Sequence, residues 1–206
     1  MTRPAWWPRA RRALSQADPV MAAIIRRHPR IALTSRGDAF ATLARSIVGQ
    51  QISVKAADAV WGRLVAACPD MAPRPVLRRR AATLRNCGLS ERKVEYLRDL
   101  AQHFASGRID ATLLQSAPDD EVIARLTEVR GIGRWTAEMF LIFNLLRPDV
   151  LPLDDLGLLK GISLSYFSGE PVSRSEAREV AAAWAPWRSV ATWYMWRAQE
   201  PTPVAY

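Results

Sequence analysis

The stretch that decides the fold is Leu126-Thr-Glu-Val-Arg-Gly-Ile-Gly-Arg-Trp-Thr-Ala-Glu-Met139. It predicts a helix that stops near Leu126, a tight turn at residues 131–133, and a second, buried helix from about Arg134 to Leu146. Glycines two positions apart let a backbone adopt positive φ and approach a ligand closely. Free N–H groups at the start of the next helix favour an anion such as a phosphate. Taken alone, the pattern also fits an ordinary tight turn between two helices.

Helix signals continue outward from this hairpin in both directions. N-cap residues recur at Asp18, Ser53, Ser90 and Ser173, and apolar residues follow them at intervals of three and four. Ser173 and Glu176 have the spacing of a capping box. Alternation with period two is nearly absent, so we expect an all-α fold of two helical lobes.

Composition excludes several classes of protein. Among 206 residues, 49% are hydrophobic and 24% charged, which permits a packed core. Two cysteines and two histidines are too few for a disulfide framework, a four-cysteine metal site or a His-triad site. Apolar runs such as Met139 to Phe143 are too short to cross a bilayer, and the first residues lack the apolar stretch of a signal peptide. We therefore expect a cytoplasmic protein with no membrane partner.

The charge points to a polyanionic partner. The formal net charge is +9, the sequence pI is about 10.5, and residues 1–30 hold seven Arg against one Asp. Basic side chains gain affinity for nucleic acid by releasing its counterions. A solvated basic surface in an arginine-rich protein remains an alternative, because only three of the 29 basic residues are lysines. The role of residues 1–30 stays open.

A second informative stretch is Asp149-Val-Leu-Pro-Leu-Asp-Asp-Leu-Gly-Leu-Leu-Lys160. Two adjacent carboxylates follow a proline and precede an apolar run that predicts a helix. Either Asp154 or Asp155 can serve simply as an N-cap. The distance between this pair of aspartates and the hairpin suggests a second interpretation.

A hairpin followed at this distance by an aspartate that opens a helix resembles the helix-hairpin-helix DNA glycosylase superfamily. Two further stretches resemble its 3-methyladenine DNA glycosylase II family: Ala44-Arg-Ser-Ile-Val-Gly-Gln-Gln-Ile-Ser-Val-Lys-Ala-Ala57 and Trp184-Ala-Pro-Trp-Arg-Ser-Val-Ala191. The similarity covers most of residues 38–197 and fits a compact form without an N-terminal β domain. It implies a central lobe over 36–148, with the hairpin at about 122–146. A second lobe is formed by 1–35 and 149–206, with a DNA-binding cleft between the two lobes.

The resemblance also implies site residues. Asp155 is the expected catalytic carboxylate, Asp154 a cap or structural residue, and Trp135 and Trp196 are the expected walls of a base pocket. The glycines of the hairpin donate amides to a DNA phosphate, and carbonyls of Thr127, Val129 and Ile132 hold a structural Na⁺ or K⁺. The residues expected to contact DNA are Gln50, Gln51, Ser53, Arg130, Gly131, Gly133 and Arg134. Many members have Leu where Gln51 stands, so which glutamine fills the gap in the duplex stays open.

The tryptophans have an alternative role in the core. At 100° per residue, Trp187 shares a helical face with Val190, Ala191 and Tyr194, whereas Trp196 falls on the opposite side. We therefore expect Trp187 in the core and Trp196 in a pocket. Trp135 begins a helix and is compatible with simple packing as well.

The expected activity follows from these residues. Bifunctional relatives place a nucleophilic lysine directly after Gly-x-Gly-Arg, and here that position is Trp135. We expect a monofunctional enzyme that flips out alkylated bases such as 3-methyladenine and 7-methylguanine, hydrolyses the N-glycosidic bond and leaves an abasic site. It would act as a monomer on double-stranded DNA in the cytoplasm, at the nucleoid, and its chemistry would need no cofactor. The alternatives are a glycosylase for oxidised, deaminated or mismatched bases, and a non-catalytic DNA-binding hairpin module.

Overall fold

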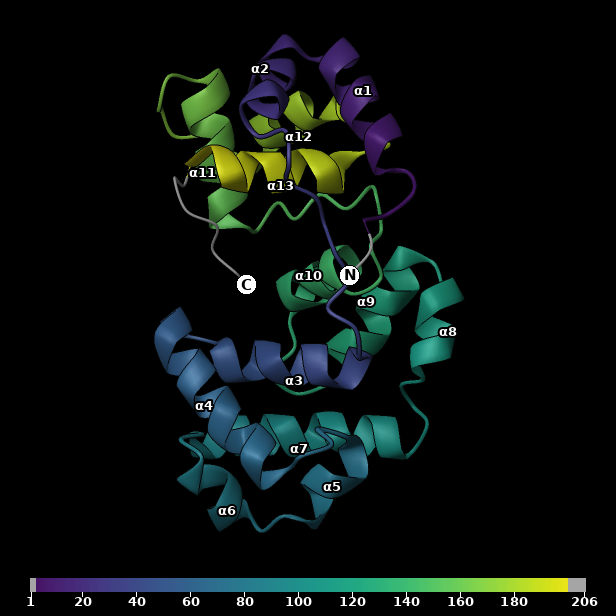
Figure 1. Ribbon diagram of the computed structural model, residues 1–206, viewed down its shortest axis with the longest axis vertical. Coiled ribbons are helices and arrows are strands. Elements are labelled where there is room, and N and C mark those ends of the chain that lie inside the picture. The colour runs from purple at the N-terminus through teal and green to yellow at the C-terminus, as the bar shows by residue number, and fades with distance from the viewer. Residues whose placement is uncertain (1–2, 200–206) are drawn as a thin grey trace. The chain divides into compact units, whose positions relative to one another are not determined.

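The computed structural model describes residues 3–199, and every regular element in that range is an α-helix, which confirms the all-α prediction (Figure 1). The chain forms two compact units. Unit 2 spans Arg36–Phe140, and unit 1 combines the chain up to Ser35 with the chain from Leu141 onward. Within residues 3–199, no helix has the length and apolar character needed to cross a membrane.

Unit 2 is built around the contact of two long helices, α3 and α7, which lie side by side (Figure 1). Phe40, Leu43 and Ile47 of α3 are buried, as are Val94, Leu97 and Ala101 of α7, and these residues form much of the core of the unit. The helices of this unit are α3 (Ala39–Gly49), α4 (Val54–Ala67), α5 (Pro73–Arg78), α6 (Ala81–Asn86), α7 (Glu91–Ala105), α8 (Ala111–Ser116), α9 (Asp119–Thr127) and most of α10 (Arg134–Phe143).

Unit 1 is built around α13, which packs against α1, α2 and α11 (Figure 1). Its core includes the fully buried side chains of Trp7, Met21, Trp184 and Tyr194. The helices are α1 (Trp7–Ala17), α2 (Pro19–Arg27), α11 (Leu156–Tyr166), α12 (Arg174–Ala182) and α13 (Arg188–Gln199).

The buried carboxylate of Asp18 joins the N-terminal and C-terminal segments of unit 1. Its Oδ1 accepts the backbone N–H groups of Val20 and Met21, which caps α2 as the sequence predicts. Its Oδ2 accepts the Tyr166 hydroxyl at 2.5 Å and Trp184 Nε1–H at 3.0 Å. Burial and the bond to Asp18 raise the pKa of Tyr166, so this hydroxyl stays protonated and keeps donating.

The boundary between the units differs from the expected one. Unit 2 begins at Arg36, but it ends at Phe140 rather than at residue 148. The reason is aromatic packing: Phe143 stacks on Trp196 with ring centroids 5.7 Å apart and meets Trp193 edge-on. Residues 141–148 therefore belong with the C-terminal helices.

The N-cap predictions from the sequence hold. Ser53 and Ser90 accept N–H groups at the starts of α4 and α7, and Ser173 and Glu176 form both bonds of a capping box at α12. These signals succeed because a cap depends on residues only two or three positions away. Helix α1 has no counterpart in the sequence reading; its Pro8, in the first turn, is the local signal.

Candidate nucleic-acid interface and active site

The hairpin lies in unit 2 between the end of α9 at Thr127 and the start of α10 at Arg134. Val129 N–H donates to Leu126 O at 3.2 Å and Ile132 N–H to Val129 O at 3.1 Å, which closes a tight turn. The second helix is shorter than predicted: α10 ends at Phe143, and Leu146 has a φ of 54°, outside the helical range. The buried positions of α10 include Ala137, Phe140 and Ile142.

The two glycines of the turn serve different purposes. Gly131 has a φ of 82°, and a Cβ there would lie 2.2 Å from the Tyr96 ring, so the backbone itself packs on that ring. Gly133 is exposed, and a Cβ there would meet nothing within 4 Å. Within residues 3–199, the amide N–H groups of both glycines have no acceptor. Gly133 thus leaves an open approach to unused amides at the N-terminus of α10, where the helix dipole favours an anion.

Two arginines flank the turn. The Arg130 side chain is exposed, and its backbone N–H donates to Asp99 Oδ2 at 2.8 Å. Arg134 is exposed as well, and its Nε donates to Glu138 Oε1 at 3.0 Å, one turn further along α10. Both guanidinium groups are therefore at the surface next to the unused amides of the turn.

The loop between α3 and α4 holds its two glutamines differently. Gln50 Nε2 donates to Gly131 O at 2.7 Å, so its side chain is directed to the hairpin. Gln51 is exposed with a left-handed φ of 58°, and Ile52 after it is also exposed. Ser53 accepts the Ala56 N–H as the cap of α4. Of the two glutamines, Gln51 is the one that projects outward, and Ile52 is an exposed neighbour that sequence reasoning missed.

Trp135 follows the hairpin in the first turn of α10. Its side chain is 40% exposed, which is unusual for an indole, so core packing does not explain this residue. The expectation that Trp135 presents an aromatic face agrees with this exposure.

Asp155 lies in unit 1 as the N-cap of α11, and its residue exposure is only 8%. Its Oδ1 accepts the Leu158 N–H at 2.6 Å and Trp196 Nε1–H at 2.7 Å. Asp154 is the expected cap or structural residue, but the cap of α11 is Asp155. Asp154 instead pairs with Arg174 at 2.6 Å on the surface. The carboxylate of Asp155 is held in place by a backbone amide and an indole.

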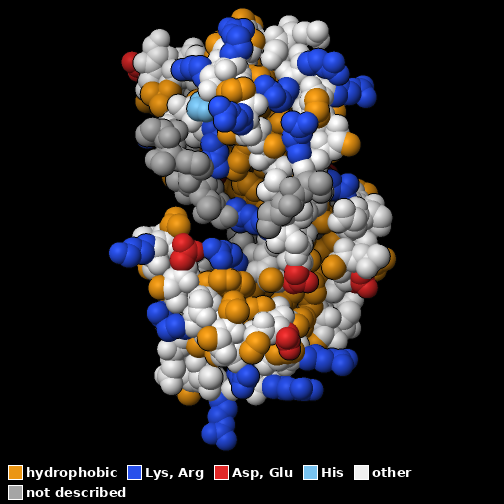
Figure 2. Space-filling model, viewed as in Figure 1, with side chains coloured by type: hydrophobic (Ala, Val, Ile, Leu, Met, Phe, Trp, Pro, Cys, Tyr) orange, Lys and Arg blue, Asp and Glu red, His pale blue; other side chains and the backbone are white. Residues whose placement is uncertain are grey.

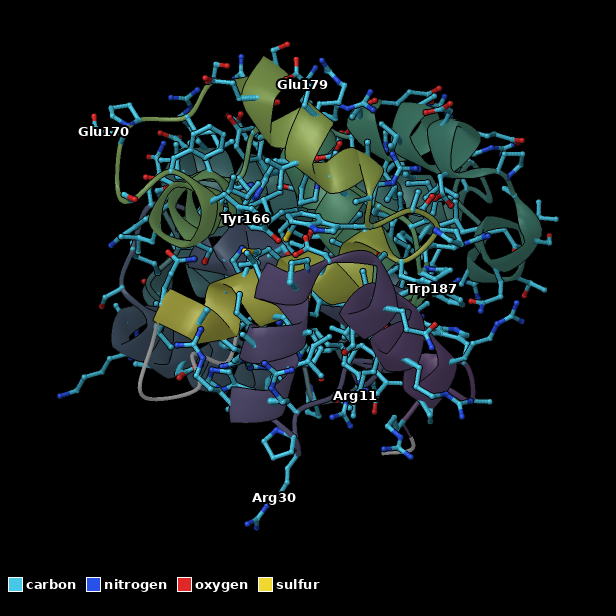
Figure 3. All side chains as sticks on the ribbon, turned by 90° about the horizontal axis from the view of Figure 1, so that it is seen from above. Arg11, Arg30, Tyr166, Glu170, Glu179 and Trp187 are labelled. Carbon is cyan, nitrogen blue, oxygen red and sulfur yellow. The ribbon has the colours of Figure 1, made fainter. Side chains whose placement is uncertain are left out.

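Trp196 corrects the prediction from the helical wheel. It is only 8% exposed, whereas Trp187 is half-buried and stacks on Trp6 with centroids 5.9 Å apart. The helical wheel places Trp187 and Trp196 on opposite sides and assumes that only one face of the helix is buried. Helix α13, however, lies at the centre of unit 1 and is buried on most sides. Trp196 is thus a core residue that also donates to Asp155, and Trp187, labelled in Figure 3, lies nearer the surface.

Two neighbours of Asp155 were missed by sequence reasoning. A Cβ at Gly157 would lie 3.1 Å from Asp155 Oδ1 and 3.1 Å from Trp196 Cδ1, so the absence of a side chain lets carboxylate and indole meet. Leu156, directly after Asp155, is 80% exposed and presents an apolar side chain to solvent. The only local signal for either residue is its position beside the carboxylate.

The segment that leads to Asp155 is fixed to the start of α13. Arg188 forms a bidentate pair with Asp149 at 2.7 and 2.6 Å, and Val150 N–H donates to Ser189 Oγ at 2.8 Å. The hydrogen bond to Asp149 raises the pKa of Arg188, so this guanidinium group stays charged. Helix α13 therefore holds the segment near Arg188 and the carboxylate near Trp196.

The carbonyls expected to hold a monovalent cation can be tested against the turn. Val129 O accepts the Ile132 N–H, while within residues 3–199 no donor reaches the carbonyls of Thr127 and Ile132. Carbonyl oxygens have two lone pairs, so all three retain acceptor capacity, and the donor set fits a hard monovalent cation. In the same part of the chain, no three His, Cys, Asp or Glu side chains cluster as a metal site.

Comparisons with known proteins agree with this geometry. Residues 44–186 match the family model of the HhH-GPD superfamily base excision DNA repair proteins. The chain is 33% identical over 162 residues to DNA-3-methyladenine glycosylase 1 of Schizosaccharomyces pombe, covering 77% of this chain and 71% of the relative. It is 40% identical over 152 residues to the DNA-3-methyladenine glycosylase of Saccharomyces cerevisiae, covering 68% of this chain and half of the relative.

Solved structures give the same result. A 3-methyladenine DNA glycosylase of Schizosaccharomyces pombe in complex with abasic DNA aligns with a TM-score of 0.83 and 29% identity, covering 93% of this chain and 96% of that one. A DNA-3-methyladenine glycosidase from Bacillus halodurans aligns with a TM-score of 0.79 and 37% identity, covering 89% and 90%. The family model spans well over half of the sequence and includes both the hairpin and Asp155. The chain therefore belongs to the HhH-GPD superfamily of base excision DNA repair proteins.

Proposed function

We propose that the protein is a monofunctional DNA glycosylase that excises alkylated bases of the 3-methyladenine and 7-methylguanine type from double-stranded DNA and leaves an abasic site. The observation that carries the proposal is the Asp155 carboxylate, held by Trp196 Nε1 at 2.7 Å at the start of α11, in a chain of this superfamily. The names of the relatives, DNA-3-methyladenine glycosylases from two yeasts, support the substrate class.

DNA is held through its phosphates. The unused amide N–H groups of Gly131 and Gly133 donate hydrogen bonds to a backbone phosphate at the N-terminus of α10. The exposed guanidinium groups of Arg130 and Arg134 add positive charge. A Na⁺ or K⁺ on the carbonyls of the turn would supply further positive charge there. Gln51, which projects from its loop, fills the space that the extruded base leaves in the duplex.

The base is selected by its charge and shape. A purine methylated at N3 or N7 is cationic, and an indole face attracts a cation. Trp135 offers an exposed indole for the extruded base. Extrusion from the stack costs a few kcal/mol, and such contacts offset that cost.

Asp155 carries the chemistry. Breaking the N-glycosidic bond builds positive charge on the sugar, and a fixed carboxylate stabilises that charge and can activate water. The proton of the attacking water passes to the carboxylate, and the electron pair of the broken bond leaves with the base. A lyase step needs an amine nucleophile, and Trp135 occupies the position where bifunctional relatives carry theirs. The DNA strand therefore stays intact. We further infer that the protein acts as a monomer in the cytoplasm, at the nucleoid.

The direct test incubates the purified protein with methylated duplex DNA. We expect free 3-methyladenine or 7-methylguanine in the soluble fraction, strand breaks only after alkali, and no adduct on borohydride treatment. Borohydride-trapped protein–DNA adducts would contradict the monofunctional mechanism. Release of oxidised or deaminated bases without methylated ones would contradict the substrate class.

A further inference from the structure

Helix α7 contacts both loops that the proposed function assigns to DNA. Lys93, Tyr96 and Asp99 stand three residues apart on α7, so they follow one stripe of the helix. Lys93 meets the loop after α3, while Tyr96 and Asp99 meet the hairpin turn. All of these residues lie in unit 2.

Lys93 holds the end of α3 and the start of its loop. Its Nζ donates to Val48 O at 2.8 Å and to Gln50 O at 2.6 Å, carbonyls 45 and 43 residues away in sequence. Gln50 is the C-cap of α3, so the ammonium group neutralises the negative end of that helix. The charge is used for positioning, because it is directed at main-chain carbonyls.

Tyr96 and Asp99 hold the hairpin turn. The Tyr96 ring occupies the space where a side chain on Gly131 would lie, and Asp99 Oδ2 accepts the Arg130 N–H at 2.8 Å. Asp99 O lies 2.9 Å from Nδ1 of His103, a buried residue one turn later in α7. The turn is thus bound to α7 at two successive residues.

Gln50 closes the connection between the two loops. Its carbonyl is bound by Lys93, and its side-chain Nε2 donates to Gly131 O at 2.7 Å. Gln51, which follows it, therefore has its backbone fixed relative to the amides of the hairpin.

We propose that Lys93 and Gln50 are positioning residues that couple phosphate binding at the hairpin to insertion of Gln51 into the duplex. This inference rests on the proposed function and adds to it the residues that join its two DNA contacts. Phosphate binding alone needs only the hairpin, but extrusion of a base needs both loops in a fixed relation. Loss of the connection should therefore affect extruded DNA far more than undamaged DNA.

The experiment compares Lys93→Met and Gln50→Met with the wild-type chain on two duplexes. One duplex is undamaged, and the other carries a tetrahydrofuran abasic analogue beside 2-aminopurine, whose fluorescence reports local unstacking. We expect each variant to bind the analogue duplex about tenfold more weakly, within the usual range for coupled sites, with a smaller fluorescence change. Affinity for the undamaged duplex should change less than about twofold.

Lys160→Met is the matched control, because it removes the same charge from an exposed lysine of unit 1. This variant should lower the affinity for both duplexes by the same factor. The double variant Lys93→Met with Gln50→Met should lose little more than either single variant, because both residues brace the same loop. Melting temperatures are measured for all variants, so that affinities are compared at the same folded fraction. If Lys93→Met folds poorly, Gln50→Met still tests the connection.

Equal losses on both duplexes, or additive losses in the double variant, would overturn the coupling. These readouts do not require base release, so they are independent of the proposed chemistry. If the wild-type chain releases no base yet the variants still lose binding to the analogue duplex, the proposed activity fails and the coupling stands.

Discussion

Trp196 links the core of unit 1 to its carboxylate. One side of the ring stacks on Phe143, and Nε1 donates to Asp155 Oδ1. A hydrogen bond to a charged group contributes about 1.5–3 kcal/mol, more than a neutral one. Truncation to Ala would also open a cavity costing about 3–5 kcal/mol. A variant that keeps an aromatic ring at residue 196 but lacks the N–H donor therefore separates packing in the core from positioning of Asp155.

Trp196→Phe should lower the single-turnover rate of base release about tenfold or more, because the carboxylate loses the indole donor that helps to fix it. The melting temperature should fall less than in Trp196→Ala, since the aromatic contact with Phe143 is retained. Trp193→Phe is the control: within residues 3–199, Trp193 Nε1 has no acceptor, so removing it disturbs no bond. Equal rate losses in both variants, measured at the same folded fraction, would show that the indole N–H does not position Asp155.

At the residue scale, burial is harder to predict from sequence than local caps are. The choice of Asp155 over Asp154 rests on the family resemblance of the hairpin, the proline-containing segment and the carboxylate, and its catalytic role stays a prediction. The burial of Trp196 is not predictable, because it depends on Phe143 and Asp155, which are 53 and 41 residues away. The contacts of Lys93 are not predictable for a similar reason, since its acceptors are main-chain carbonyls at the end of another helix.

At the element scale, the hairpin assigns different tasks to two glycines. Gly131→Ala forces a side chain into positive φ and against the Tyr96 ring, so it should destabilise the chain by about 1–3 kcal/mol or more. Gly133→Ala meets open space and should change stability by no more than about 0.5 kcal/mol.

The substitution at residue 133 should instead affect DNA binding per folded molecule. A methyl group at residue 133 stands where a phosphate approaches, so Gly133→Ala should weaken binding to undamaged duplex about fivefold or more, the loss of about 1 kcal/mol. Thermal unfolding and fluorescence anisotropy measure the two quantities. A Gly131→Ala variant as stable as the wild type would show that the turn does not depend on packing against Tyr96. A Gly133→Ala variant that binds DNA as tightly as the wild type would show that the turn is not a phosphate site.

Helices with local signals are the predictable elements. The caps at Asp18, Ser53, Ser90 and Ser173 set helix starts within one residue. Three six-residue helices, α5, α6 and α8, escape prediction, because so short a stretch shows no apolar period. Their form depends on packing against longer helices.

At the scale of the whole molecule, the functions are divided between the units. Unit 2 holds the hairpin and the glutamine loop, and unit 1 holds the carboxylate and its indole. The two-lobe organisation is predictable from a long helical chain without strands. The end of unit 2 at Phe140 is not, because it is set by aromatic contacts of Phe143 within unit 1.

The charge of the molecule should dominate its binding to undamaged DNA. Arg9, Arg12, Arg26, Arg27 and Arg30 are all exposed. Basic side chains gather over α1 and α2 in Figure 2, and Figure 3 shows Arg30 projecting outward. If about five phosphates are neutralised, doubling the salt concentration should lower affinity about twentyfold. A salt titration with duplexes of unrelated sequence measures this slope. Affinity unaffected by salt would mean that the basic side chains do not face DNA.

The most direct test of the account replaces one carboxylate at a time and measures single-turnover release of methylated bases. Asn still caps a helix, so Asp155→Asn should fold and bind DNA normally while losing about 10³-fold in rate, since the sugar cation loses its counter-charge. Asp154→Asn removes only an exposed pair with Arg174 and should stay within about threefold of wild type. Full activity in Asp155→Asn, or equal losses in the two variants, would contradict the central claim that Asp155 drives base excision.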